Sequence, residues 1–286
     1  MKLTVIIPVY NAAKSLPALF KCLKSNLKHL DHTTEILLID DGSTDDSYAR
    51  CKDFVDETKG ARVYHQKNSG PSAARNLGLE KTHGDYITFI DADDKIAPTF
   101  LKTLLDEIEK SPDIPLVSTA VKRIKSDKTE NIYDSPAKPY SPAQTWTEYL
   151  LSLLLPDGRL YPIHNKIFRA DIIKTNQLRF DESINFAEDL KFVLEYLKLT
   201  DTPEELVFLS KPLYTYYQSS GVFSENATKW ANYEKSFNFL TAWALTPRQN
   251  EQFTKTQLRH ISKLLQHIKL RWRISCLLNN LRSSKK

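Results

Sequence analysis

The sequence predicts an α/β fold with a mostly parallel central sheet flanked by helices. Over residues 3–120, short β-rich runs alternate with segments of helical periodicity. Such alternation favours right-handed crossovers between parallel strands. Polar and acidic residues directly follow several of these runs, at the sheet edge where ligands bind in parallel sheets. Hydrophobic residues make up 41% of the 286-residue chain, which is enough for a sizeable core.

The first half contains five predicted strands separated by four predicted helices. The strands are rich in β-branched, aromatic and leucine residues and lie at 3–7, 35–39, 62–65, 86–90 and 115–120. The helices carry apolar residues three and four positions apart and lie at 14–27, 44–57, 72–81 and 98–110.

The second half extends the sheet and then becomes helical. Residues 121–142 are polar and contain three prolines, which favours a loop or a weak hairpin. Further β-like runs lie at 205–209 and 213–217. Helices are predicted at 142–155, 185–199, 224–245 and 247–281.

Three carboxylates follow the fourth predicted strand, at Asp91, Asp93 and Asp94. Side chains two residues apart on an extended segment point the same way, so Asp91 and Asp93 can face one site across Ala92. Paired carboxylates suit Mg²⁺ or Mn²⁺ held together with substrate phosphates. A solvated turn would explain these acids taken alone, but their place at the carboxyl edge of the sheet favours a metal site.

Residues 40–45, DDGSTD, follow the second predicted strand. Ser43 or Thr44 can cap the next helix, but a cap does not explain the two carboxylates of Asp40 and Asp41. Such carboxylates can accept hydrogen bonds from a nucleotide base or a ribose. The chain lacks both G-x-G-x-x-G and G-x-x-x-x-G-K-[ST], so neither a dinucleotide site nor a P-loop is supported.

Two other segments carry candidate site residues. Residues 67–76 contain a Gly-Pro turn that leads into a helix, where backbone N–H groups favour anions and Arg75 can face a diphosphate. A turn with a surface arginine is the alternative. Glu188 and Asp189 begin an amphipathic helix, where acids favour the helix dipole and can alternatively act as a general base for a hydroxyl.

In this order, these segments resemble the family 2 glycosyltransferases of the GT-A fold, the inverting type of bacterial surface-polysaccharide synthesis. The matching segments are 5–11 (VIIPVYN), 40–45 (DDGSTD), 68–70 (NSG), 74–76 (ARN), 91–94 (DADD), 165–169 (NKIFR), 188–189 (ED) and 213–216 (LYTY). The resemblance implies a GT-A catalytic domain over 1–220, with a nucleotide-sugar half at 1–120 and an acceptor-side half at 121–220. A helical C-terminal region would follow at 221–286.

The resemblance also implies how the donor is held. Asp41 would bind the uracil of a UDP-sugar, with Pro8 and Tyr10 lining the base pocket. Asp93, together with Asp91, would hold Mn²⁺ or Mg²⁺ on the diphosphate, where the cation stabilises the leaving group. The other residues expected at the nucleotide-sugar site are Asn11, Asp40, Asn68, Gly70, Arg75 and Ala92.

On the acceptor side, the resemblance makes Asp189 the base that deprotonates a hydroxyl of a glycan or lipid-linked acceptor, with Glu188 as the alternative. Members of the family often have a glycine before these acids, where this chain has Ala187. The Q-x-x-R-W motif of processive synthases is absent, which favours transfer of a single sugar.

Two other functions compete with this interpretation. A sugar-phosphate nucleotidyltransferase also combines an α/β fold with paired carboxylates, but it usually has a glycine-rich N-terminal loop, and residues 7–11 contain no glycine. A non-catalytic sugar-nucleotide-binding protein is the second alternative, and the presence of Asp41, Asp93 and Asp189 argues against it.

The three cysteines lack metal-site spacing, as expected for free thiols in a reducing cytoplasm.

The C-terminal segment is strongly basic. Residues 252–286 contain nine of the chain's 40 lysines and arginines and no acid. Within 261–286, apolar residues recur at helical spacing, which fits either an interfacial helix on an anionic membrane surface or a helix packed on the core. No run is long enough to span a bilayer, so we expect a cytoplasmic protein, peripheral on the inner face of the membrane. Nucleic-acid binding is disfavoured because Trp272 is the tail's only tryptophan or tyrosine.

Overall fold

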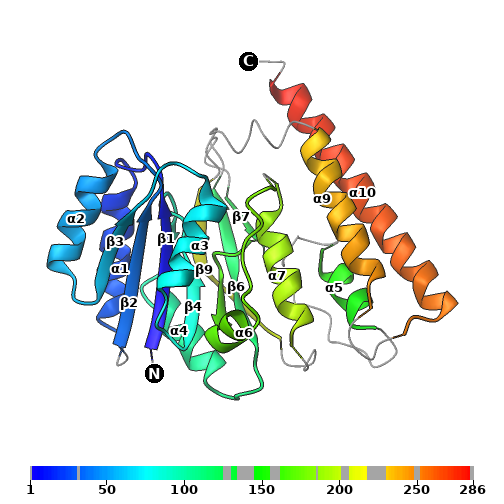
Figure 1. The fold of residues 1–286 in the computed structure, drawn as a ribbon, viewed down its shortest axis with the longest axis horizontal. Helices are drawn as coiled ribbons and strands as arrows, with labels where there is room; N and C mark the ends of the chain where they lie inside the picture. The colour runs from blue at the N-terminus through cyan, green and yellow to red at the C-terminus, as the bar shows by residue number, and fades with distance from the viewer. Residues whose placement is uncertain are drawn as a thin grey trace.

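In a computed structural model of the chain, a mixed sheet lies between two layers of helices, with further helices at one end (Figure 1). The described residues are 2–30, 33–124, 130–133, 145–154, 162–184, 186–200, 206–217, 230–247 and 252–283. The strands are β1 (Lys2–Val9), β2 (Thr33–Asp40), β3 (Ala61–His65), β4 (Tyr86–Phe89), β5 (Lys95–Ile96), β6 (Leu116–Ile124), β7 (Glu130–Tyr133), β8 (Lys166–Arg169) and β9 (Val207–Tyr217). The helices are α1 (Leu16–Leu27), α2 (Ser47–Glu57), α3 (Pro71–Lys81), α4 (Phe100–Ile108), α5 (Trp146–Leu154), α6 (Ala170–Thr175), α7 (Glu188–Lys198), α9 (Trp230–Leu245) and α10 (Lys255–Ser283).

The strands pair in the order β3-β2-β1-β4-β8-β6-β9-β5, and β7 pairs with β6. The N-terminal half, from β3 to β4, is parallel throughout, as the alternation of strands and helices predicts. β8 runs antiparallel to both of its neighbours, β4 and β6, and β5 runs antiparallel to β9. The predicted α/β fold is confirmed, and its second half is more mixed than its first.

The two faces of the sheet follow the period-two alternation of the strands. Leu3, Val5 and Ile7 of β1 belong to one core together with apolar residues of α1 and α4. Ile6 points the other way, into a core shared with α3, α7 and the C-terminal helices. Because both faces are covered, β1 is apolar nearly throughout its length.

Several short elements are absent from the sequence prediction. β5, β8 and α6 have two, four and six residues, too few to produce a periodic signal. The sequence predicts two β-like runs where the structure has the single strand β9. The register of β9 against β6 shifts between Leu209 and Pro212, which is the point where the two predicted runs separate. β7 pairs with the end of β6 and confirms the hairpin over that part, whereas the rest of 125–142 lies outside the described residues.

The C-terminal helices pack on the rest of the chain, because α10 contacts α5 and α9, and α9 contacts α7. The apolar residues of α10 that are buried in the main core are Ile261, Leu264, Leu265, Ile268 and Trp272. Trp272 meets Phe186 and Phe237 edge to face. The apolar face of residues 261–272 is therefore unavailable to a bilayer, which corrects that part of the interfacial-helix prediction. Among the described helices, none is long and apolar enough to cross a membrane.

Candidate active site

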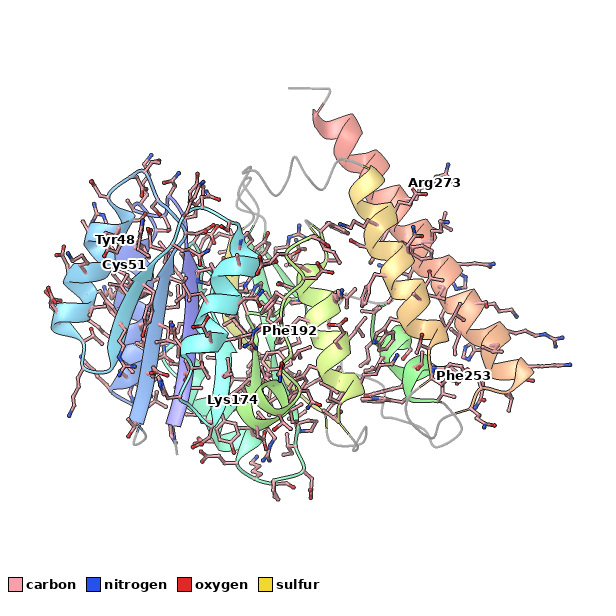
Figure 2. All side chains as sticks on the ribbon, in the orientation of Figure 1. Tyr48, Cys51, Lys174, Phe192, Phe253 and Arg273 are labelled. Atoms are coloured by element: carbon pink, nitrogen blue, oxygen red, sulfur yellow. The ribbon has the colours of Figure 1, made fainter. Side chains whose placement is uncertain are left out.

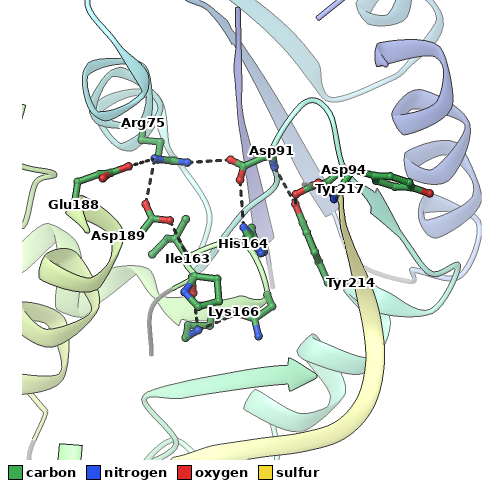
Figure 3. Close-up of polar contacts among 12 residues, drawn as sticks. Arg75, Asp91, Asp94, Ile163, His164, Lys166, Glu188, Asp189, Tyr214 and Tyr217 are labelled. Atoms are coloured by element: carbon green, nitrogen blue, oxygen red, sulfur yellow. Dashed lines mark hydrogen bonds and ion pairs between the residues drawn. The ribbon is translucent and has the colours of Figure 1, made fainter. Parts of the chain in front are cut away.

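A cluster of charged residues lies where the sheet meets α3 and α7 (Figure 3). Asp91 follows β4, Arg75 lies in α3, and Glu188 and Asp189 open α7. His164 comes from the turn just before β8. Arg75 and Asp189, which are about 115 residues apart in the sequence, thus meet in one site. In parallel sheets, ligands bind at the carboxyl ends of the strands, which is where Asp91 lies.

Arg75 is the centre of this cluster. Its Nη2 donates to Asp91 Oδ1 at 2.9 Å, and its Nη1 lies 3.2 Å from Asp189 Oδ1 and 3.8 Å from Glu188 Oε1. The side chain is only 5% exposed and its guanidinium lies over the Phe180 ring. Burial alone would lower the pKa of Arg75, but the three carboxylates outweigh it and raise that pKa. Acids therefore surround the Arg75 guanidinium, and its expected contact with a diphosphate stays a prediction.

Asp91 is held from three directions. Besides Arg75, it accepts a hydrogen-bond contact from His164 Nδ1 at 3.2 Å, and its backbone N–H donates to the Tyr214 hydroxyl. Burial would raise the pKa of Asp91, but Arg75 and His164 lower it below its usual range. The His164 ring stacks on Tyr214, with centroids 4.2 Å apart, and on Tyr216. Asp91 therefore remains an ionised carboxylate with a fixed orientation.

The acids beside Asp91 differ in their surroundings. Asp94 is buried, and its carboxylate accepts from the Tyr214 hydroxyl at 2.8 Å and from Tyr217 N at 2.9 Å. Asp93 is exposed on the same turn. Desolvation by the surrounding protein raises the pKa of both carboxyls, although Asp93 itself is exposed, and the charge of Asp91 adds to the effect.

One group of side chains could hold a metal ion. Among the described residues, Asp91, Asp94 and His164 each offer a ligand atom, and these atoms lie within 4.8 Å of one another. Two carboxylates with one imidazole form a donor set that suits a divalent ion such as Mn²⁺. Of the two ligands expected from the sequence, Asp91 is one of the three and Asp93 is not, although the exposed Asp93 directly precedes Asp94 in the chain.

Asp189 and Glu188 form the other side of the cluster. Asp189 Oδ2 accepts from the backbone N–H of Ile163 at 3.3 Å, while its Oδ1 is buried beside Arg75 without a hydrogen bond to any described residue. Burial raises the pKa of Asp189, and Arg75 partly offsets this. Burial and the neighbouring Asp189 raise the pKa of Glu188 to about 7. The Asp189 side chain is 21% exposed against 9% for Glu188, so Asp189 is the better placed of the two to accept a proton from a bound hydroxyl.

Ala187 explains why a glycine is common before these acids. Its backbone is left-handed, with φ 59° and ψ 28°, at the point where the chain turns into α7. Residues with a Cβ are strained in this conformation, whereas glycine is not. The departure from the family pattern therefore keeps the turn that aims Glu188 and Asp189 at Arg75, at the expense of local strain.

We expect Ala187→Gly to raise the free energy of unfolding by about 0.5–1 kcal/mol, because relief of left-handed strain exceeds the added chain entropy of glycine. Urea denaturation measures it. Ala73→Gly, inside α3, is the matched control and should instead lower stability by about 0.5–1 kcal/mol. Equal destabilisation by both changes would contradict a left-handed Ala187.

A second group of predicted residues lies at the ends of β1, β2 and β3. The buried Asp41 accepts from Ser69 N, Gly70 N and Gln66 Nε2 at 2.7–2.8 Å. Its carboxylate therefore fixes the 66–70 loop, a role that the sequence did not suggest. Asp40 is also buried and contacts His65 Nδ1 at 2.7 Å.

The loops around Asp41 are closely packed. Asn11, at φ 47°, accepts from Thr44 N through its side chain, which joins the ends of β1 and β2. Gly42 has φ 69°, and a Cβ there would lie 2.7 Å from Asn68 N, so only glycine fits. The remaining predicted residues line the same edge: Tyr10 and Asn68 are exposed, Pro8 is half-buried and Ala92 is buried.

Sequence reasoning overlooked His164, Tyr214 and Phe180 as site residues. His164 directly precedes the Asn165-Lys166 pair of the family-like segment, and Tyr214 lies within the LYTY segment. Neither position had a spacing relation to Asp91 that could have placed it there. Their contacts arise from the pairing of β8 and β9 with the rest of the sheet.

The family assignment comes from comparison with known proteins. The model of the family described as glycosyl transferase family 2 matches residues 4–175, which is more than half of the chain. The chain belongs to this family. It is 28% identical over 231 residues to the uncharacterized glycosyltransferase EpsJ of Bacillus subtilis, covering 78% of this chain and 62% of EpsJ. The chain thus spans less than two thirds of that relative's length.

Two solved structures have the same GT-A-type fold as this family 2 chain. One is S. aureus TarS 1–349 in complex with UDP-GlcNAc, with a TM-score of 0.70 and 22% identity over 93% of this chain and 72% of TarS 1–349. The other is the mannosyltransferase PcManGT of Pyrobaculum calidifontis with GDP-Man and Mn²⁺, with a TM-score of 0.62 and 13% identity over 98% of this chain and 73% of PcManGT. At these identities the likeness establishes the fold.

Proposed function

We propose that the protein is an inverting transferase that moves one sugar from a UDP-sugar to a hydroxyl of a glycan or lipid-linked acceptor in bacterial cell-surface polysaccharide synthesis. The observation that carries the proposal is the Arg75 cluster. It joins Asp91, at the strand end where a donor diphosphate would bind, to Asp189, which has an acceptor oxygen free of hydrogen bonds to described residues. The UDP-GlcNAc complex of TarS supports a uridine donor for this fold.

In the proposed reaction, Asp189 takes the proton of the acceptor hydroxyl. The acceptor oxygen then bonds to the anomeric carbon while the bond from that carbon to the β-phosphate oxygen breaks, so the configuration inverts and UDP leaves. Arg75 and Ile163 N–H orient Asp189 for this step. Asp41 holds the loop that, in our proposal, borders the uracil together with Pro8 and Tyr10.

We include Mn²⁺ or Mg²⁺ in the proposal because the available donors fit such an ion. Asp91, Asp94 and His164 would hold it, with the exposed Asp93 as a further ligand on the open side. When bound, the ion supplies positive charge that stabilises the leaving diphosphate. The complex of PcManGT with Mn²⁺ supports a cation in this fold.

UDP release from a panel of UDP-sugars, with Mn²⁺, Mg²⁺ or EDTA, tests donor and metal together. We expect metal-dependent release from one or a few donors, and a higher half-saturating Mn²⁺ concentration in Asp93→Ala and His164→Gln. Asp56→Asn, an exposed acid on α2, is the matched control and should behave as wild type.

The outcomes separate the parts of this proposal. Release in EDTA at the wild-type rate would remove the metal from the mechanism. Turnover of GDP-sugars alone would show that the donor carries guanosine rather than uridine. If no nucleotide sugar is turned over but one binds, the chain is a binding protein and the transferase proposal fails.

A further inference from the structure

The solvent side of α10 is a separate feature, at the opposite end of the molecule from α2 and β3 (Figure 1). Its buried apolar residues are Ile261, Leu264, Leu265, Ile268 and Trp272, which belong to the main core. Successive residues of an α-helix are about 100° apart, which places residues 255, 259, 263, 266, 270 and 273 on the opposite side, and these residues are exposed. Figure 2 shows long side chains, Arg273 among them, that project from α10 away from the body.

Four cations form a row on this side. Positions 255, 259, 263, 266, 270 and 273 are three or four residues apart and so lie on one face. We call Lys255, Arg259, Gln266, Lys263, Leu270 and Arg273 the outer face. All six are exposed, and Leu270 is 55% exposed.

The charge of the outer face is not neutralised within the described structure. Residues 252–286 contain no acid, so α10 supplies no internal partner. In the part of the chain that the structure describes, Glu148 of α5 is the acid paired with α10, and its partner is His260 rather than a residue of the outer face. A row of unpaired cations on a rigid element is suited to an extended anionic surface.

We propose that the outer face of α10 docks the protein onto an anionic lipid bilayer by electrostatic adsorption, without insertion of the helix. A 29-residue helix is about 43 Å long, so a planar surface can meet the whole row at once. Leu270, exposed within the row, can contact the lipid boundary. Among the described exposed side chains of α10 there is no phenylalanine, tyrosine or tryptophan to stack on bases, which disfavours single-stranded nucleic acid.

This inference goes beyond the transferase reaction and does not depend on it. Docking would hold the enzyme at the surface where a lipid-linked acceptor is found, but binding to vesicles is measurable without donor or acceptor. A truncation is a poor test, because removal of Ile261 to Trp272 would also remove buried core residues. Substitutions on the outer face leave that core in place.

The test is co-sedimentation of the full chain with vesicles of phosphatidylcholine alone or mixed with phosphatidylglycerol. The outer-face variant combines Lys255→Gln, Arg259→Gln, Lys263→Gln and Arg273→Gln. The control removes four exposed lysines from α1, α2 and the residues that follow these helices, through Lys21→Gln, Lys28→Gln, Lys52→Gln and Lys59→Gln. We expect at least about tenfold weaker binding to the mixed vesicles for the outer-face variant and little change for the control.

Raised salt should release the wild type from mixed vesicles, because adsorption at an exposed surface is screened. Circular dichroism checks that both variants fold. Equal binding by the two variants would overturn the proposal, as would absence of wild-type binding. Salt-resistant binding to phosphatidylcholine alone would show insertion instead. If duplex DNA competes for the protein at a lower concentration than phosphatidylglycerol does, the outer face would be assigned to nucleic acid.

Discussion

Asp189→Asn should lower kcat by about 10²–10⁴-fold and change the donor KM by no more than about twofold, because an amide cannot take the acceptor proton. Asparagine has the same shape and can still accept from the Ile163 N–H, so the start of α7 should keep its geometry. Initial rates of UDP release in the presence of acceptor measure the change. The proposal that Asp189 acts as the base would be contradicted by unchanged kcat.

Glu188→Gln is the matched control for that result, because it makes the same chemical change one residue away. Glu188 lies farther from Arg75, at 3.8 Å against 3.2 Å for Asp189. Burial and the neighbouring Asp189 raise the pKa of Glu188 to about 7, and its side chain is the more buried of the two. We expect a much smaller loss of kcat. If Glu188→Gln loses more activity than Asp189→Asn, the two roles are exchanged.

The parts of the site that follow directly from strand ends could be predicted from the sequence. Asp41 and Asp91 each end a run of buried β residues, and parallel pairing of β2, β1 and β4 brings such ends to one edge. The alternation of strands and helices is a local signal, and it is sufficient to place both residues.

The parts that depend on distant pairing could not be predicted in the same way. His164 reaches Asp91 because β8 inserts between β4 and β6 and runs antiparallel to both, which no local pattern indicates. The apolar stripe of α10 is equally suited to a membrane and to a protein core. Only the positions of α5 and α9 decide that the apolar stripe between Ile261 and Trp272 is buried.

Arg75→Met should lower the free energy of unfolding by roughly 3–5 kcal/mol, because it leaves buried carboxylates without their cation. Arg75 contacts Asp91, Glu188 and Asp189, and no other arginine or lysine of the described residues forms an ion pair with any of them. Methionine fills similar volume, so the loss reports charge rather than packing. Urea denaturation measures it, and Arg179→Met, on the exposed residue beside Phe180, should stay within about 0.5 kcal/mol of wild type.

Arg75→Lys separates the charge of Arg75 from its shape. A lysine keeps the positive charge but has a single ammonium, which cannot reproduce the two-sided contact of the guanidinium with Asp91 and Asp189. We expect stability between those of wild type and Arg75→Met, and a kcat closer to that of Arg75→Met. Wild-type kcat in Arg75→Lys would show that charge alone is needed.

The pH dependence of kcat in Arg75→Lys gives an independent measure of the same contact. Asp189 must be ionised to accept a proton, so kcat falls as the pH decreases through its pKa. Burial and the negative charges of Asp91 and Glu188 raise the pKa of Asp189. The positive charge of Arg75, together with His164 and the Ile163 N–H, lowers it. A looser cation lowers it less, so the acid limb of the kcat profile should move to higher pH. A variant that is merely destabilised would lose folded protein but keep the wild-type limb, whereas a shift without loss of folded protein identifies Arg75 as the residue that keeps the base ionised.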